Sequence, residues 1–229
     1  MLRHTILIAL LFNVLGCFSK ISKPGPDTGT TLALSAERLL QQYPIVRSQP
    51  LEQYHTELLS RLGTALPAAP RPGVRFRVRL VRMEQPFAFA LPEGTIVVST
   101  GLALRAESEA SYAFVLAHEM GHLMLGHYDQ DTADLRNLNL RPQLEDGADQ
   151  YGLALVTRAG YDPRSAVLAV EELRFHVADT VATEGSTHPE LLSRLQRMSS
   201  LIALSGWRPP GTTTTREHQR FLRLLGAGL

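Results

Sequence analysis

The chain has 229 residues, of which 44% are hydrophobic and 20% are charged. This composition is typical of a folded globular protein and too apolar for a disordered one. A formal net charge of +1 provides no bulk field for binding nucleic acid, so no nucleic-acid partner is expected. The length allows one sizeable domain with its own core.

The first residues are typical of an export signal. "MLRHTILIALLFNVLGC" has a basic start, an apolar stretch from Ile6 to Leu15 and then Gly16-Cys17. The apolar stretch is too short to span a bilayer comfortably, and its build is that of a secretory signal. "VLGC" resembles a bacterial lipobox, in which the cysteine is lipidated and becomes the first residue; the alternative is a generic signal with an incidental cysteine.

Cys17 is the only cysteine of the chain, which favours the lipobox. We therefore expect a lipoprotein signal peptide over residues 1–16 and a lipid-anchored linker over 17–31, where proline, glycine, serine and threonine predominate. The mature chain would have no disulfide. Phe18 after the cysteine, in place of an aspartate, favours the outer membrane of the bacterial periplasm.

Residues 31–43 and 50–66 show helical spacing of leucine and alanine, and "PAAPRPG" then breaks the chain. "VRFRVRLVR" (74–82) alternates strictly, which predicts a half-buried strand with its arginines on a solvated face. The alternative for these arginines is an anion-binding stripe. "FAFALPEGTIVVSTGL" (87–102) predicts two short strands around the turn Pro92-Glu93-Gly94.

Helical patterns follow from Ser108 to His127 and over 142–159, 163–177 and 189–204. "RPPGTTTTRE" is typical of a loop, and "HQRFLRLL" predicts a final short helix. Helices, then a small sheet, then helices predict an α+β domain over 32–205. A C-terminal loop and short helix would occupy 206–229.

"AHEMGHLMLGH" (117–127) contains the pattern H-E-x-x-H. On a helix, His118 and His122 share one face and can bind one tetrahedral zinc ion. Glu119 is rotated by about 100° and can act as a base beside the metal. His127 lies about 140° from His122 on an ideal helix and is predicted to face elsewhere, as a helix-terminal residue. The alternative is a helix that carries histidines by chance.

"LEDGADQYGLAL" (144–155) offers a third ligand for one zinc ion per chain. Glu145 and Asp149 share a helix face, whereas Asp146 points about 100° away. We expect Glu145 on the metal, with Asp149 holding a histidine's free N–H or assisting proton transfer. The alternative is a solvated acidic helix start.

H-E-M-G-H (118–122) with E-D-G-A-D (145–149) resembles the HtpX-like zinc endopeptidases of metallopeptidase family forty-eight, which includes the CAAX prenyl endopeptidase. "AFALPEGTIVVSTGL" and "THPELLSRLQRM" extend the resemblance over residues 35–205. It implies a mostly helical, gluzincin-type α+β domain with a small sheet before the active-site helix. The implied ligands are His118, His122 and Glu145; Glu119 would be the general base, and Asp149 a supporting or proton-donating group.

The sequence departs from the family at two points. Phe87 stands where the family usually has asparagine before the A-F-A stretch, and Glu93-Gly94 replaces a Gly-Gly turn. Both concern the strand that would hold substrate, not the metal site. The extra hydrophobic spans of integral-membrane members are not evident, so the chain resembles the lipid-anchored periplasmic branch.

These observations predict a zinc metalloendopeptidase that cleaves unfolded or misassembled envelope proteins, held in extended form along an edge strand near 87–98. Candidates for stabilising the oxyanion are Tyr151, Tyr161, His188 and Arg194. His188 could instead reach the zinc and keep the enzyme latent, or simply form a helix-start turn with Pro189.

Two other classes of protein stay open. One is a chaperone-like assembly factor that binds envelope clients beside a latent zinc site, and the other is an inert lipoprotein scaffold. Glu119 discriminates the peptidase from the chaperone-like factor, because a purely structural zinc site has no need of a base. The inert scaffold predicts no metal in the purified protein.

Overall fold

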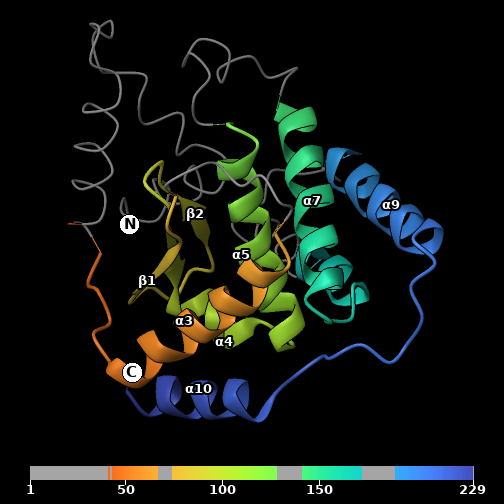
Figure 1. Ribbon diagram of the computed structural model, residues 1–229. Helices are drawn as coiled ribbons and strands as arrows, with labels where there is room; N and C mark the ends of the chain where they lie inside the picture. The colour runs from red at the N-terminus through yellow and green to blue at the C-terminus, as the bar shows by residue number, and fades with distance from the viewer. Residues whose placement is uncertain (1–40, 42, 67–73, 128–140, 172–188, 229) are drawn as a thin grey trace, which may run out of the picture.

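The computed structural model describes residues 41, 43–66, 74–127, 141–171 and 189–228. The elements with defined bounds are α3 (Gln49–Thr64), β1 (Arg77–Val81), β2 (Ala88–Ala90), β3 (Thr95–Ser99), α4 (Thr100–Arg105), α5 (Glu109–Met124), α7 (Arg141–Arg158), α9 (Pro189–Leu204) and α10 (Arg216–Ala227) (Figure 1). Residues 164–171 are also helical. The signal peptide, Cys17, the linker, nearly all of the helix expected over 31–43, and His188 lie outside the described residues.

The three strands form one mixed sheet in the order β1-β3-β2. β1 runs parallel to β3 and pairs Arg77 with Thr95, whereas β2 runs antiparallel and pairs Ala88 with Val98. The turn between β2 and β3 includes Gly94 at φ 96°, where a Cβ would lie 2.5 Å from the carbonyl oxygen of Arg75. Only glycine fits there, and the expected pair of strands around this turn is confirmed.

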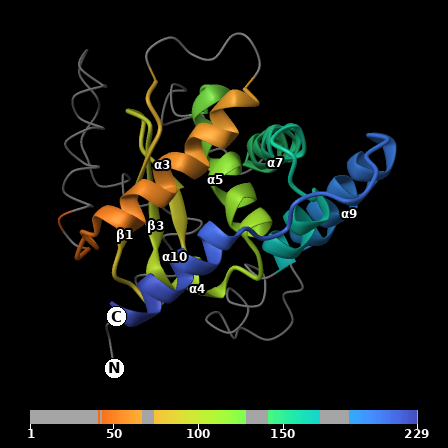
Figure 2. The same ribbon diagram turned by 60° about the horizontal axis from the view of Figure 1, so that its bottom comes forward.

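Helices cover one face of the sheet (Figure 2). α3 packs on β1, and α5 packs on β2 and β3. Every residue of the central strand β3 is buried. The main core lies between these layers and includes Leu58, Leu62, Ile96, Val98 and Met120. A second, smaller cluster on the other face contains Tyr43, Val81, Phe87, Phe89, Leu91 and Val97.

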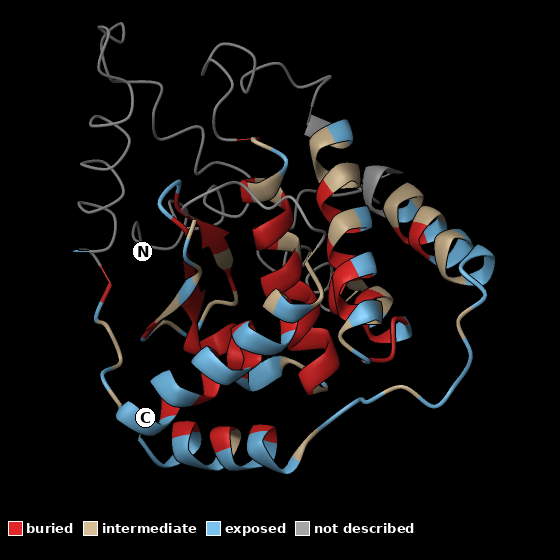
Figure 3. Cartoon of the chain, viewed as in Figure 1, coloured by how far each residue is buried: buried red, intermediate tan, exposed pale blue. Residues whose placement is uncertain are grey.

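α5 runs through the centre of the molecule and is buried on almost all sides (Figure 3). Its N-cap, Ser108, accepts a hydrogen bond from the backbone N–H of Ser111, which satisfies a donor that the first turn leaves unpaired. The helix ends at Met124, three residues before its expected end. Gly126 follows in the left-handed region at φ 72°, a typical helix stop.

Two helices differ from the sequence-based expectation. α4 occupies residues that the apolar pattern assigned to the end of a strand, because the Ser99 side chain caps it by accepting from the N–H of Leu102. α10 begins at Arg216, two residues early, because Thr215 caps it. Phe221 and Leu225 of α10 belong to the main core, so this helix is part of the same folded unit as α3.

Among the described helices, none combines the length and the apolar composition needed to cross a membrane.

Candidate metal centre

The candidate site lies between α5, which carries His118, Glu119 and His122, and α7, which carries Glu145 and Asp149. The two helices lie side by side in both ribbon views (Figures 1 and 2). The H-E-x-x-H pattern and the acidic helix, separated in the sequence, therefore meet in the fold.

Two glycines allow this close approach of the helices. A Cβ on Gly121 would lie 3.1 Å from the Cα of Ala148, and a Cβ on Gly152 would lie 3.0 Å from the backbone nitrogen of His118. Any larger side chain at either position would push the backbones apart. The distance between the histidines and Glu145 thus depends on residues that carry no functional group.

His118, His122 and Glu145 form a compact triangle of donor atoms. The two Nε2 atoms are 3.1 Å apart. Glu145 reaches both rings, with Oε2 at 3.5 Å from Nε2 of His118 and Oε1 at 3.5 Å from Nε2 of His122. Each of these side chains is partly buried.

This triangle has the size of one face of a small metal tetrahedron. An ion with bonds of about 2.0–2.1 Å and tetrahedral angles separates its ligand atoms by about 3.4 Å. The observed separations of 3.1, 3.5 and 3.5 Å fit that value. The three side chains can therefore hold one divalent ion, with the fourth vertex left for a water molecule or a substrate.

Asp149 and Arg194 form a buried support behind the triangle. Oδ1 of Asp149 lies 3.0 Å from Nδ1 of His118. Arg194, on α9, donates from Nε to Oδ2 and from Nη2 to Oδ1 of Asp149, at 2.8 and 2.9 Å, and its Nη1 lies 3.1 Å from Oε2 of Glu145. One guanidinium thus fixes two carboxylates that sit one turn apart on α7.

These contacts set the protonation of the site. Burial disfavours the charged form of every group here, and it lowers the pKa of His122 to about 3. Burial acts the same way on His118, but hydrogen bonds to Asp149 and Glu145 outweigh it and raise its pKa to about 10. Although burial opposes ionisation, the same histidine and Arg194 hold the pKa values of Glu145 and Asp149 below their usual range. Both carboxylates are therefore ionised at neutral pH.

Glu119 behaves differently from the other carboxylates. It is 9% exposed, and burial raises its pKa to about 7, although the charge of His118 opposes the shift. A carboxylate poised near neutrality can both accept and release a proton. Since α5 packs on β2, the candidate base lies on the helix beside an edge strand of the described sheet.

The prediction for His127 is wrong. Its ring does not face away; Nδ1 of His127 lies 2.8 Å from Nδ1 of His122. The expectation assumed that the helix continues, whereas Gly126 reverses the chain and the N–H of His127 bonds to the carbonyl of His122. The glycine one residue earlier is the sequence signal that could have revealed this turn.

The remaining candidates for stabilising an oxyanion have different surroundings. Tyr161 is fully buried, and its hydroxyl donates to Oε1 of Glu109 near the start of α5 at 2.7 Å. This hydroxyl therefore stabilises the fold and is not available to an oxyanion. The guanidinium of Arg194 is committed to Asp149 and Glu145. The hydroxyl of Tyr151 is buried and has no hydrogen-bond partner among the described residues. His188 is outside the described part of the chain.

Fold and site together define an α+β metallopeptidase domain: a small sheet, a buried helix with two histidines and a glutamate, and a carboxylate from a second helix. Comparison with known proteins agrees with this class. Residues 52–140 match Peptidase family M48, and residues 104–208 match Peptidase U49.

Individual relatives are also named as metalloendopeptidases or proteases. The chain is 34% identical over 197 residues to the mitochondrial metalloendopeptidase OMA1 of Arabidopsis thaliana, covering 74% of this chain and 39% of the relative. It is 25% identical over 203 residues to OMA1 of Schizosaccharomyces pombe, covering 72% of this chain and 56% of the relative. The beta-barrel assembly-enhancing protease of Escherichia coli is 21% identical over 196 residues, covering 65% and 40%.

The chain belongs to the M48 family of metallopeptidases. It spans 39–56% of the length of these relatives. The resemblance noted in the sequence is confirmed at the level of the family, and the HtpX-like branch within it stays a prediction.

Proposed function

We propose that this protein is a zinc metalloendopeptidase of the bacterial cell envelope that hydrolyses peptide bonds in unfolded or misassembled proteins. The observation that carries the proposal is the triangle of His118, His122 and Glu145 with the buried carboxylate of Glu119 beside it. Two imidazoles and one carboxylate, with a fourth position open, are typical of catalytic rather than structural zinc sites.

The protein's own residues divide the work of hydrolysis. When bound, a zinc ion supplies a Lewis acid that polarises the scissile carbonyl and makes the attacking water more acidic. Glu119 accepts the proton of that water and delivers it to the leaving amine, a task suited to its pKa of about 7. Asp149 holds the ring of His118 through Nδ1, which orients Nε2 toward the ion.

The substrate would lie extended along β2. This strand is at the edge of the described sheet, and the packing of α5, which carries Glu119, on β2 supports placing the scissile peptide beside it. A segment that pairs with a strand edge must expose its own backbone. Such a site selects unfolded polypeptide over folded protein.

Hydrolysis can be tested on the purified full-length chain. We expect about one zinc ion per chain by mass spectrometry, cleavage of unfolded casein, loss of cleavage on chelation and recovery with added zinc. Glu119→Gln removes the base and should lower the cleavage rate by roughly 10²–10⁴-fold. Glu107→Gln is the matched control, because Glu107 is exposed in the loop before α5.

The same pair of variants separates hydrolysis from a chaperone-like function. If Glu119→Gln keeps zinc and still restores all activity in cells that lack the wild-type protein, the peptidase proposal is wrong and client binding is favoured. A purified protein without metal would point instead to a scaffold.

The envelope location rests on the sequence and on one relative. The lipobox-like "VLGC" places Cys17 after a short apolar segment, and the Escherichia coli relative is named for β-barrel assembly. The plant relative is named as mitochondrial. We expect a palmitate analogue to label the wild-type chain but not Cys17→Ser, and labelling of both or neither would contradict a lipid anchor at this cysteine.

A further inference from the structure

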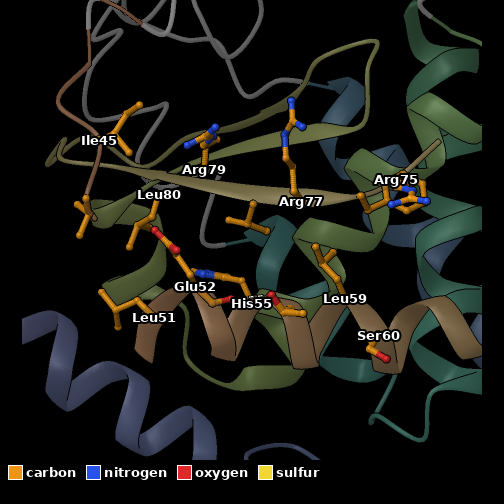
Figure 4. A pocket seen from close by; sticks show the side chains of 14 residues that line it. Ile45, Leu51, Glu52, His55, Leu59, Ser60, Arg75, Arg77, Arg79 and Leu80 are labelled. Atoms are coloured by element: carbon orange, nitrogen blue, oxygen red, sulfur yellow. Dashed lines mark hydrogen bonds between the residues drawn. The ribbon is translucent and has the colours of Figure 1, made fainter. Parts of the chain in front are cut away.

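A second groove lies between β1 and α3, on the side of the sheet remote from β2 (Figure 4). Its volume is about 540 Å³. One wall is the unbroken run of residues 75–80, and the other is one face of α3, including Leu51, His55 and Leu59. Since this wall consists of the first four residues of β1 and the two residues before it, the groove follows the backbone edge of β1.

Part of this edge is already paired. Ile45 forms an antiparallel bridge to Val81, with the N–H of Val46 donating to the carbonyl of Leu80 at 2.9 Å. The chain then turns away into α3 at Gln49. The short pairing segment therefore lines one end of the groove, with Ile45 and Val46, and does not extend along the rest of it.

The rest of the edge offers unpaired backbone groups. The carbonyl of Leu80 accepts from the N–H of Val46, and the N–H of Arg82 donates to the carbonyl of Pro44, both on the side of β1 away from β3. The N–H of Arg77 donates to the carbonyl of Gly94, on the side of β1 that faces β3. Because alternate residues of a strand point their backbone groups in opposite directions, those of Phe76 and Val78 point outward. No backbone bond joins them to any other residue in the part of the chain that the structure describes.

The side chains beside this edge alternate between two chemical types. Figure 4 shows Arg77 and Arg79 projecting away from α3, whereas Leu80 points toward it. Phe76 and Val78 are half-buried against the main core. Among the described residues, Arg75 and Arg79 have no ion-pair partner; Arg77 has only an exposed one, Glu93, at 3.8 Å. An extended ligand would meet apolar surface on one side and positive charge on the other.

We propose that this groove binds an extended polypeptide segment of alternating acidic and apolar residues, which adds to β1 as an antiparallel strand. The register follows from the existing pairs. Ligand residues opposite Arg77 and Arg79 are acidic, and the residue between them, opposite Val78, is apolar and exchanges both backbone hydrogen bonds with it. The open edge accommodates about five residues at roughly 3.3 Å each.

This site is separate from the metal centre. Glu119 is on α5, which packs on β2 at one edge of the sheet, and β3 lies between β2 and β1. Occupancy of the β1 groove requires neither a metal nor hydrolysis, so its test is independent of the proposed peptidase activity. Nucleic acid would satisfy the arginines but not the outward-facing backbone groups of Phe76 and Val78.

The test uses fluorescence anisotropy with the full-length chain, carrying Glu119→Gln so that no peptide is cut. The probe is a labelled seven-residue peptide that alternates glutamate with valine or threonine. We expect it to bind at least tenfold more tightly than an alternating lysine peptide or a peptide of the same composition with its glutamates in one block. If the peptide with its glutamates in one block binds equally well, the interaction is unspecific charge attraction and the proposal is overturned.

Methylation of peptide nitrogens tests the strand pairing without altering the protein. N-methyl groups on the apolar residues remove the donors that face Val78 and should abolish binding, whereas N-methyl groups on the glutamates point away from β1 and should leave it within about threefold. If both methylated peptides bind alike, strand addition at β1 is wrong.

Charge reversal tests the location. Arg79→Glu should weaken binding of the alternating acidic peptide by at least tenfold, whereas Arg220→Glu, at an exposed position of α10, should leave it unchanged. An unaltered affinity in a folded Arg79→Glu protein would place the peptide elsewhere. Should that variant not fold, Arg75→Glu serves the same purpose at the other end of the groove.

Discussion

Each imidazole of the metal centre has a partner on its other ring nitrogen. Nδ1 of His118 faces Asp149 at 3.0 Å, and Nδ1 of His122 faces His127 at 2.8 Å. Such partners fix which nitrogen carries the proton and how the ring is turned. One partner is a carboxylate on the neighbouring helix, and the other is a neutral ring supplied by the end of the same helix. The two ligand histidines are thus held by different chemistry.

His127→Ala should weaken zinc binding by about 10–100-fold, the usual effect of removing such a partner. The ring of His122 would lose the contact that orients it, while the three donor groups stay in place. Competition with a fluorescent chelator measures the affinity directly. His127→Gln, whose side-chain oxygen can accept from Nδ1 of His122, should restore part of it; an unchanged affinity in His127→Ala would show that the contact has no positioning role.

Arg194 and Arg197 lie three residues apart on α9 and differ mainly in burial. The Arg194 side chain is 12% exposed and its partner Asp149 is 2% exposed, whereas the pair of Arg197 with Asp146 is 40% and 28% exposed. Arg194→Ala should lower the free energy of unfolding by about 3–5 kcal/mol, because it removes one of the two cationic partners of a buried carboxylate, the other being His118. Arg197→Ala should cost about 0–1 kcal/mol.

Urea unfolding of both variants gives the comparison. Similar losses for the two arginines would mean that burial does not control the strength of these pairs, which would also weaken the view of Arg194 as the support of Glu145 and Asp149.

At the scale of elements, the site depends on how closely α5 and α7 pack. Gly152 meets the backbone of His118, so a methyl group there has no flexible side chain to displace. Helix propensity favours alanine over glycine by about 1 kcal/mol, whereas overpacking costs about 1–3 kcal/mol. The steric cost therefore exceeds the gain.

Gly152→Ala should reduce stability by up to about 2 kcal/mol and also weaken zinc binding, since the helices separate at the level of His118. Gly63→Ala in α3 is the matched control, because a Cβ there meets nothing within 4 Å; it should be neutral or slightly stabilising. Thermal unfolding and chelator competition provide the two measurements. A Gly152→Ala protein as stable as Gly63→Ala would contradict the close-packing argument.

The elements also show how far the sequence can be interpreted. α9 was predicted within its observed bounds because leucine spacing and Pro189 define it, and the strands around Gly94 were predicted from the turn chemistry. α4 was missed because it follows the apolar run of β3 without a break. Periodicity predicted that His118 and His122 share one helix face and that Glu145 and Asp149 share another, and the family resemblance predicted that the two helices meet. The contacts of His127 and Arg194 depend on a chain reversal and on the packing of α9, which neither signal describes.

At the scale of the whole molecule, α3 and α10 meet in an aromatic cluster with two buried histidines. Nε2 of His55 lies 2.8 Å from the hydroxyl of Tyr112, and Nδ1 of His218 lies 2.6 Å from that of Tyr54. Burial lowers the pKa of His55 to about 4 and also lowers that of His218. Both rings are therefore neutral in the folded protein at neutral pH.

Stability should fall as the pH drops from about 6.5 to about 4. In this window the unfolded chain takes up a proton on His55 that the folded protein does not, so the unfolded state is favoured by up to about 3 kcal/mol. Above the ordinary histidine pKa, His55 is neutral in both the folded and the unfolded state, so protonation of His55 no longer lowers the free energy of unfolding. His55→Gln should flatten the dependence of the free energy of unfolding on pH, measured by urea titration at several pH values; an identical slope would assign the effect to other groups.

The contact between Tyr54 and His218 joins residues 164 positions apart in the chain. Since α10 contributes Phe221 and Leu225 to the core beneath α3, a ribosome must synthesise the chain as far as α10 before that core can close. The histidines of α5 emerge about a hundred residues earlier. A nascent chain therefore displays its candidate metal ligands well before it can hold them rigidly, which would delay the proposed peptidase activity until translation has passed α10.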